Sequence, residues 1–218
     1  MKIVSFFHLL KLDKPKYAYI DSLYEDIKQY NLDVKNSFWF YQVFPLHSAD
    51  ILIWSSFDFE NEDKLNYILS FLANLFYRNT LHVVDVLWGF TKPSIYTKTQ
   101  KSPQEIDPFS NERKTYLIVY PFVKTAEWYL LKKDTRQGMM NEHIRIGRQY
   151  PSILQLLLYC FGLSNHEFIV SYETNSLTQF EELVQELRSS DARKYTLRDT
   201  PIYIAIHRNI EDFKNILL

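Results

Sequence analysis

The chain has 218 residues, of which 46% are hydrophobic and 17% aromatic, and this composition excludes a disordered protein. Its formal net charge is -1 and it has no long basic run, so the charge pattern predicts no nucleic-acid partner. Only 4 glycines are present, and neither a phosphate-binding loop nor a dinucleotide fingerprint can be placed on them.

The N-terminal residues 1–17 contain a short apolar run that predicts a first strand. They lack a small-residue cleavage site, so they are not typical of a signal peptide. A single cysteine, Cys160, excludes an intrachain disulfide and indicates a reducing compartment, so we expect a cytoplasmic protein. No apolar stretch approaches about 20 residues, so we expect no membrane partner.

The rest of the first half alternates between helix and strand patterns. Apolar residues spaced three and four apart predict helices, and β-rich runs bounded by turn residues predict strands. The expected order is a helix at 16–31, strands at 38–44 and 49–59 with a turn between them, a helix at 61–79 and a strand at 81–90. Asn61 or Asp63 would cap the second helix. The apolar face of that helix carries Leu65, Ile68, Leu69, Leu72 and Leu75.

The second half repeats this order. It predicts a strand at 115–122, a helix at 134–150, strands at 153–163 and 166–174, a helix at 176–190 and a strand at 200–207. A repeated βαββαβ unit predicts an α+β fold of two tandem ferredoxin-like repeats that form a pseudo-dimer, with antiparallel sheets and the helices outside. We expect the repeats at 1–97 and 115–218. Residues 98–114, rich in polar and turn-forming residues, would form an exposed linker.

His143 lies in the predicted helix 134–150. Residues three and four apart share a helix face, so His143 shares one with Met139, Ile146 and Gly147. This face is apolar and should be buried, and a buried imidazole needs a partner. The pattern leaves two interpretations open. One is a structural histidine hydrogen-bonded to backbone. The other is a single axial ligand to a haem iron, with Gly147 leaving room for a flat ligand.

Three other side chains have both a functional and an ordinary interpretation. Tyr120 closes an apolar strand and Lys124 follows it closely; a phenol beside an ammonium could relay protons and contact an anion. They could equally be a sheet aromatic and a solvated edge charge. Gln155 is the polar residue of an apolar strand, and it would bind a ligand only if it faced a pocket.

The motifs in residues 120–174, beginning "YPFVK" and ending "FIVSYET", and the later "FEELVQEL" and "YTLRDTPIY", together resemble the chlorite dismutase family of haem proteins. The first half is similar through "ADILIWSS" and "GFTKPSIYT". The resemblance implies the same ferredoxin-like repeats, a homopentamer, and a haem site in the second half with His143 as the proximal ligand to iron.

The resemblance also separates two activities within the family. Chlorite-degrading members carry a distal arginine at the position of Gln155, and a glutamine there is similar to the coproheme decarboxylase branch. In that branch Tyr120 would be the radical tyrosine that takes hydrogen from a propionate, Lys124 would assist with protons, and hydrogen peroxide would oxidise the iron. The cofactor or substrate would be haem b or iron coproporphyrin III.

This chain departs from the branch at several positions, and these departures leave undecided which residues would bind the propionates. The branch usually has "YPMSK" where this chain has "YPFVK", and "YTLRDTPIY" is closer to the chlorite-degrading members. Thr200 stands in place of a propionate-binding serine, and Arg193 or Lys194 could contact a propionate. The counterpart of an upstream arginine could be Lys98, Lys101 or Arg113. Arg198 could also lie near the propionates.

Three hypotheses for the function follow. The first is a haem-dependent oxidoreductase that decarboxylates iron coproporphyrin III to haem b with peroxide, for which the residues would be His143, Tyr120, Lys124, Gln155, Thr200 and Lys194. The second is a chlorite dismutase or a weak haem peroxidase. The third is a non-catalytic haem-binding protein or a cofactor-free pentameric scaffold.

Overall fold

The computed structural model describes residues 2–12, 18–29, 33–44, 48–78, 82–93, 95–96 and 102–209. The chain divides into two compact units, residues 1–91 with 108–111 and 205–218, and residues 92–107 with 112–204. Residues 45–47 of the turn predicted at 45–48 lie outside the described residues, as do Lys98 and Lys101. No helix in the described part of the chain is long and apolar enough to cross a lipid bilayer.

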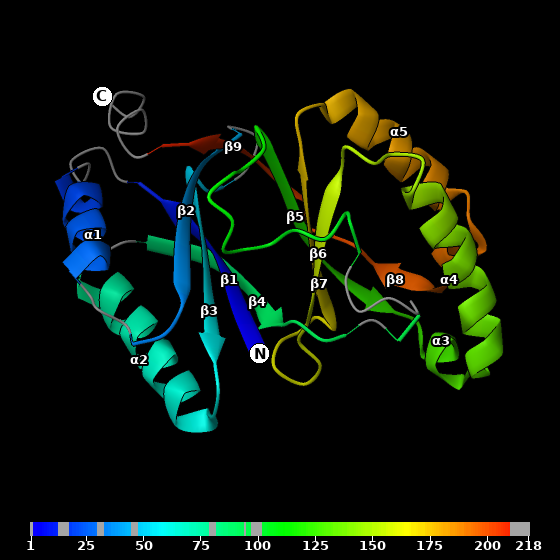
Figure 1. Cartoon of the computed structure of the whole chain (residues 1–218), viewed down its shortest axis with the longest axis horizontal. Coiled ribbons are helices and arrows are strands. Elements are labelled where there is room, and N and C mark those ends of the chain that lie inside the picture. The colour runs from blue at the N-terminus through cyan, green and yellow to red at the C-terminus, as the bar shows by residue number, and fades with distance from the viewer. Residues whose placement is uncertain are drawn as a thin grey trace. The chain divides into compact units, whose positions relative to one another are not determined.

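The first unit has the predicted order of strands and helices. Its elements are β1 (Lys2–Lys11), α1 (Ala18–Gln29), β2 (Asn36–Val43), β3 (Ile51–Phe59), α2 (Glu62–Arg78) and β4 (His82–Phe90). All pairings are antiparallel, with β1 between β3 and β4, and with β2 on the outer side of β3. This is a ferredoxin-like βαββαβ repeat (Figure 1), as expected.

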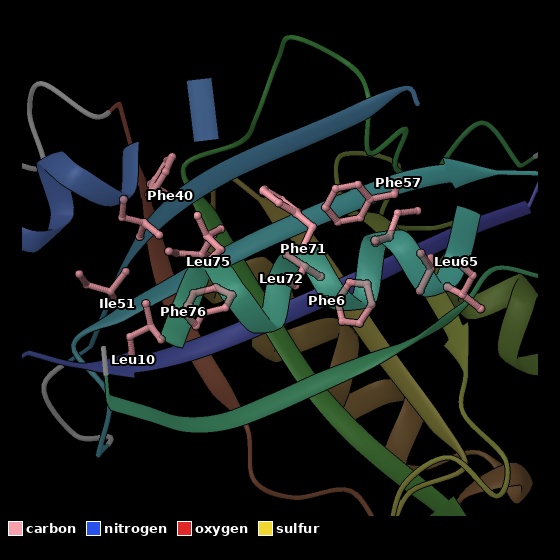
Figure 2. Packing of buried hydrophobic residues seen from close by; sticks show 14 of the residues in the cluster. Phe6, Leu10, Phe40, Ile51, Phe57, Leu65, Phe71, Leu72, Leu75 and Phe76 are labelled. Atoms are coloured by element: carbon pink, nitrogen blue, oxygen red, sulfur yellow. The ribbon is translucent and has the colours of Figure 1, made fainter. Parts of the chain in front are cut away.

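The core of the first unit lies between one face of this sheet and its helices. Asn61 caps α2 by accepting a hydrogen bond from Lys64 N at 3.0 Å. The buried face of α2 packs against alternate residues of the strands, because side chains two apart on a strand share a face. Figure 2 shows this cluster, which includes Phe6, Leu10, Phe40, Ile51, Phe57, Leu65, Phe71, Leu72, Leu75 and Phe76.

The second unit repeats the arrangement with additions. Its elements are β5 (Tyr116–Lys124), α3 (Ala126–Leu130), α4 (Lys133–Gly147), β6 (Leu154–Tyr159), β7 (Phe168–Thr174), α5 (Leu177–Arg188), the 3₁₀ helix η2 (Asp191–Tyr195) and β8 (Thr196–Arg198). The last strand, β9 (Tyr203–Arg208), begins in this unit, and its residues 205–208 belong to the first unit, where they pair with β2. Strand β7 pairs with β6 and β5, and β5 also pairs with β8, all antiparallel. The expected α+β fold of ferredoxin-like repeats is confirmed.

Register in this sheet places the candidate residues. Gln155 is opposite Tyr172, and Tyr120 is opposite Val170. Alternation along each strand then puts all four on one face of the sheet. The same face packs against Ile146 of α4 and Leu183 of α5. The second unit therefore encloses its core between this sheet face and the helices α4 and α5, as Figure 1 shows.

Candidate functional site

His143 lies in the middle of α4 with a largely buried imidazole. Burial, together with the smaller effect of the nearby charge of Lys124, lowers its pKa to about 4. Its Nδ1 atom is buried and has no hydrogen-bond partner among the described residues. The ring is therefore neutral at neutral pH and has a nitrogen that the described part of the chain does not use.

Space for a ligand exists one turn further along the same helix face. A Cβ added at Gly147 would meet no atom within 4 Å. Arg136, seven residues before His143 and so on the same face, has a buried Nε without a partner in the described segments. An unused buried nitrogen of His143 one turn from open space, with a second unused buried nitrogen on the same helix face, fits an anionic, metal-containing ligand better than a packed core.

Lys124 is the cation beside His143. Its Nζ atom donates to Thr196 Oγ1 at 3.1 Å and to Ala192 O at 3.4 Å, and it lies 4.8 Å from the centre of the Trp128 ring. Burial lowers its pKa to about 8, and the charge of Arg193 acts in the same direction. An ammonium with a pKa near neutrality can donate and regain a proton at physiological pH.

The backbone of Lys124 is held as firmly as its side chain. Its N–H donates to Glu167 Oε2 at 2.7 Å, and the hydroxyl of Tyr129 donates to the same oxygen at 2.5 Å. Glu167 precedes β7, so this carboxylate ties the end of β5 to the start of the neighbouring strand. The backbone from which the Lys124 side chain extends is therefore held in place by both β5 and the residue before β7.

Tyr120 is the buried phenol of the site. Burial raises its pKa well above the usual value, and the neighbouring Tyr172 raises it further. The two rings are stacked, with centroids 6.1 Å apart. Asp199 raises the pKa of Tyr120 as well, whereas Arg188 lowers it. Tyr120 is therefore protonated at neutral pH, with an ion pair of Arg188 and Asp199 near its hydroxyl.

Gln155 has its side chain exposed on the sheet face that it shares with Tyr120. Its backbone is fixed by the segment before β5: its N–H donates to Gln104 O at 2.8 Å, and its carbonyl accepts from Ile106 N at 2.9 Å. The Gln104 side chain in turn donates to the carbonyls of Gly147, Tyr150 and Ile153. One segment therefore holds both the end of α4 and the start of β6.

Among the candidates for anion contacts, the structure separates neighbours in sequence. Lys194 is exposed and forms an ion pair with Asp191 at 2.7 Å. Arg193 is the residue whose charge acts on Lys124, and its Nη1 is 2.6 Å from Asp199 Oδ2. Thr200, in the loop after β8, is exposed. We therefore rank Arg193 above Lys194 as the cation nearest the site.

Two other predicted cations are engaged elsewhere. Arg113 is buried in an ion pair with Glu173 at 3.4 Å and donates to Asp107 O. Glu173 pairs with Leu117 and Leu154, which places it on the sheet face opposite Tyr120. Arg198 donates to Asn165 O at 2.8 Å. Neither arginine is brought to His143 by a described contact.

Trp128, Arg136 and Tyr172 are site neighbours that sequence reasoning missed. The signal for Arg136 was its spacing of seven from His143 on one helix.

A cavity of about 200 Å³ between α4 and α5 contains none of the candidate residues. It is lined by Glu142, Arg145, Ile146, Glu186, Ser189 and Ser190. Its volume is below the roughly 300 Å³ at which ligand pockets usually begin.

The model of the family named chlorite dismutase matches residues 18–208 of this chain. The chain belongs to the chlorite dismutase family. Among curated family members, the coproheme decarboxylase of Mycolicibacterium smegmatis is 29% identical over 75% of this chain and 69% of its own length. The coproheme decarboxylase of Staphylococcus saprophyticus is also 29% identical, over 64% of this chain and 61% of its own length.

Solved structures of the family support the fold. A chlorite dismutase from Candidatus Nitrospira defluvii in complex with imidazole matches with a TM-score of 0.81 and 19% identity, over 99% of this chain and 94% of the other. A mutant of a chlorite dismutase from the same organism matches with a TM-score of 0.81 and 20% identity, over 99% and 95%. At this identity the likeness shows the shared fold.

Proposed function

We propose that this chain binds an iron porphyrin through His143 and catalyses the peroxide-dependent oxidative decarboxylation of iron coproporphyrin III (coproheme) to haem b. The observation that carries the proposal is the buried, neutral imidazole of His143, with an unused ring nitrogen, beside Lys124. A neutral imidazole is the species that ligates iron, and a single one suffices because the porphyrin supplies the other nitrogens. The two curated coproheme decarboxylases support this activity within the family.

The residues found here fit an iron porphyrin. His143 would hold the iron, open space lies beside Gly147, and the site is lined by cations that suit carboxylates. When bound, the iron porphyrin supplies both the centre at which peroxide is reduced and the propionates that react. For each propionate, the side chain loses carbon dioxide and a hydride equivalent to become a vinyl group. One peroxide and one proton take up that equivalent and become two waters.

The protein would contribute proton and hydrogen transfer at defined atoms. Lys124 Nζ, with its pKa lowered to about 8, holds a proton that can be donated at neutral pH and recovered from solvent. Tyr120 Oη keeps its proton in its buried position at rest. It would take a hydrogen atom from a propionate after the phenol had given one electron to the oxidising equivalent derived from peroxide and had released its proton. Gln155, from the same sheet face as Tyr120, would offer a neutral hydrogen-bonding group to a molecule bound there.

Propionate recognition would come from the segment after α5. Arg193 would be the principal cation, and the hydroxyl of Thr200 and the ammonium of Lys194 would be outer contacts. Coproheme has four propionates and haem b has two, so a decarboxylase needs more cations than a haem b protein. Arg136 adds one such cation on the His143 side of α4.

A mass measurement tests the proposal. The purified protein is incubated with iron coproporphyrin III and limiting hydrogen peroxide, and the porphyrin masses are then read. We expect the stepwise loss of two carboxyl groups. Tyr120→Phe should abolish this loss, and Tyr116→Phe, which removes a phenol from the same strand and the same core cluster, should not. Bleaching of the porphyrin without decarboxylated product would overturn the proposal.

The same preparation separates the other candidates. Dioxygen release from chlorite, followed with an oxygen electrode, would identify a chlorite dismutase. The absence of a Soret band after porphyrin addition would identify a cofactor-free scaffold. A Soret band without any turnover would identify a non-catalytic haem-binding protein. Sedimentation of the purified chain would test the expected homopentamer.

A further inference from the structure

The ammonium of Lys124 is held by a segment that lies far from it in sequence. Strand β8 pairs with the end of β5, and the register sets Thr196 directly opposite Lys124. Side chains of directly opposed residues lie on the same face of a sheet. Leu197, the next residue of β8, is 70% exposed and lies on the other face. The hydroxyl of Thr196 is therefore presented on the face where the Lys124 side chain lies.

Two oxygens and an aromatic ring lie around the Lys124 Nζ atom. It donates to Thr196 Oγ1 at 3.1 Å and to Ala192 O at 3.4 Å, and the centre of the Trp128 ring is 4.8 Å away. Trp128 is buried, and its ring packs against Tyr195 with centroids 5.7 Å apart. An aromatic face attracts a cation without fixing the direction of each N–H bond. That direction must come from the two oxygens, of which the Thr196 hydroxyl is the closer.

The segment that carries both acceptors is itself fixed. The 3₁₀ helix η2 ends at Tyr195, and Thr196 follows directly as the first residue of β8. The carbonyl of Tyr195 accepts a hydrogen bond from the backbone N–H of Thr125 at 3.0 Å, which ties this segment to the residue after β5. Glu167 holds the backbone N–H of Lys124 at 2.7 Å. The lysine is therefore anchored at its backbone and at the end of its side chain.

The number of donors on the ammonium gives this anchoring a consequence for the site. An ammonium has three N–H donors, and two of those on Lys124 have acceptors among the described residues. With two N–H bonds directed at fixed oxygens, the tetrahedral nitrogen directs the third to one place. A proton donor must lie within about 2.6–3.2 Å of the atom that it protonates. The acceptors of Lys124 therefore decide whether the third N–H can reach a bound molecule.

We propose that Thr196 is a positioning residue, which accepts a hydrogen bond from Lys124 and thereby holds the ammonium where its third N–H can reach a bound molecule. This inference rests on the proposed function, in which Lys124 is the proton donor. Thr196 acts through Lys124 and not on the substrate. Its loss should therefore slow the reaction step and leave substrate binding unchanged.

Two substitutions at Thr196 separate the hydroxyl from the rest of the side chain. Thr196→Val replaces the hydroxyl with a methyl group of similar size, so it removes the acceptor and keeps the shape. Thr196→Ser keeps the hydroxyl and removes the methyl group. Thr178→Val is the matched control, because it removes a threonine hydroxyl from α5 that shares a hydrogen bond with Ser176. A role of the hydroxyl predicts an effect in the first variant alone.

Nitrogen-15 NMR of the lysine ammonium groups in the porphyrin-free protein tests the contact directly. At about pH 6, below the Lys124 pKa of about 8, the group is charged, and Lys124→Met identifies its signal. We expect Thr196→Val to speed proton exchange with water by at least about threefold and to lower the order parameter of the Cε–Nζ axis. Thr196→Ser and Thr178→Val should keep the wild-type values. Wild-type values in Thr196→Val, or equal changes in Thr196→Ser, would overturn the positioning role.

Steady-state decarboxylation at the same pH supplies the second readout. We expect Thr196→Val to lower kcat for coproheme by about threefold to tenfold and to leave KM unchanged, as for loss of a well-placed hydrogen bond. Thr196→Ser should keep kcat within about twofold of the wild type. An unchanged kcat in Thr196→Val would also overturn the role of Thr196. If the wild type binds coproheme without decarboxylating it, the proposed function fails, and the NMR comparison alone decides whether Thr196 holds the ammonium.

Discussion

Among the described residues, each repeat has a buried histidine: His8 on β1 in the first and His143 on α4 in the second. Burial lowers the pKa of both, to about 3 for His8 and to about 4 for His143. In both, Nδ1 is buried and has no hydrogen-bond partner among the described residues. By ionisation alone the two rings are nearly equivalent, and either could be chosen as a metal ligand.

Their surroundings separate them. His8 is packed between aromatic rings, with the Phe76 centroid at 4.1 Å and the Phe6 centroid at 5.8 Å. Burial is the only cause that shifts its pKa. His143 instead has the charge of Lys124 nearby and open space beside Gly147. A buried neutral histidine is therefore not by itself a site, and the neighbouring cation and the free volume are what distinguish the second repeat.

The largest expected effect is on porphyrin binding, which should need the imidazole of the second repeat and not the imidazole of the first. His143→Ala should lower the affinity for an iron porphyrin by at least about 100-fold, because the axial ligand is lost. His8→Phe should leave the affinity unchanged, since Phe fits the aromatic surroundings of His8. Titration of each variant, followed at the Soret band, measures both. A loss of affinity in His8→Phe that equals the loss in His143→Ala would remove the distinction between the two repeats.

Acid should destabilise the first repeat through His8. The folded pKa is about 3 and the unfolded value about 6.5, so between these pH values the unfolded chain binds the additional proton. The free energy of unfolding contributed by a neutral His8 is complete above pH 6.5 and is lost as the pH falls towards 3. Its slope is about 1.4 kcal/mol per pH unit.

Urea unfolding of the wild type and of His8→Phe at a series of pH values measures this slope. The difference between the two proteins should grow as the pH falls below 6.5 and should be constant above it. Other groups titrate equally in both proteins, so the difference isolates His8. A difference that does not change with pH would show that folding does not shift the pKa of His8.

Replacing Lys124 should affect only one of the two histidines. Lys124→Met removes a positive charge that lowers the pKa of His143, so that pKa should rise from about 4, while the pKa of His8 stays at about 3. Proton NMR of the imidazoles in the porphyrin-free protein follows both rings. Decarboxylation should slow by about tenfold or more with the proton donor gone. In the wild type the rate should fall above pH 8, where Lys124 loses its proton.

The sequence predicted the repeats because their signals are long and local. Periodicity over α2 and the cap at Asn61 are both confirmed. The short elements α3, η2 and β8 were missed, because five residues or fewer carry too little periodicity to be distinguished from a loop. The domain limits at 97 and 115 stay predictions, and the second compact unit begins at Lys92.

The site was less accessible to sequence reasoning because its contacts join distant segments. The helix period was enough to predict that His143 faces inward. Its neighbour Lys124 comes from β5, and only the folded structure shows that the charge of Lys124 lowers the pKa of His143. Arg193 and Lys194 are adjacent in sequence, so their side chains leave η2 in different directions. Choosing between them requires the rotation of η2 about its axis, which the sequence does not give. Tyr172 reaches Tyr120 through the β5–β7 register, and register is not readable from either strand alone.

The smallest expected effect concerns how α4 is held in place. Gln104 Nε2 donates to the carbonyls of Gly147, Tyr150 and Ile153 at 2.9–3.1 Å, which satisfies acceptors at the end of the helix. Gln104→Leu should lower the free energy of unfolding by about 1–2 kcal/mol, because these carbonyls lose their donor. Gln149→Leu, an exposed change in the same turn, is the matched control.

The same variant tests whether the second repeat needs a rigid helix for its function. The backbone of Gln104 also pairs with the backbone of Gln155, so Gln104 links the end of α4 to β6. Without its side chain this link is lost, and the distance between His143 and Gln155 should vary more. We expect porphyrin affinity to fall by about threefold to tenfold in Gln104→Leu, measured at the Soret band, and the slope assigned to His8 to stay the same. Reduced stability with unchanged affinity would mean that His143 is held by the packing of α4 on the sheet rather than by Gln104.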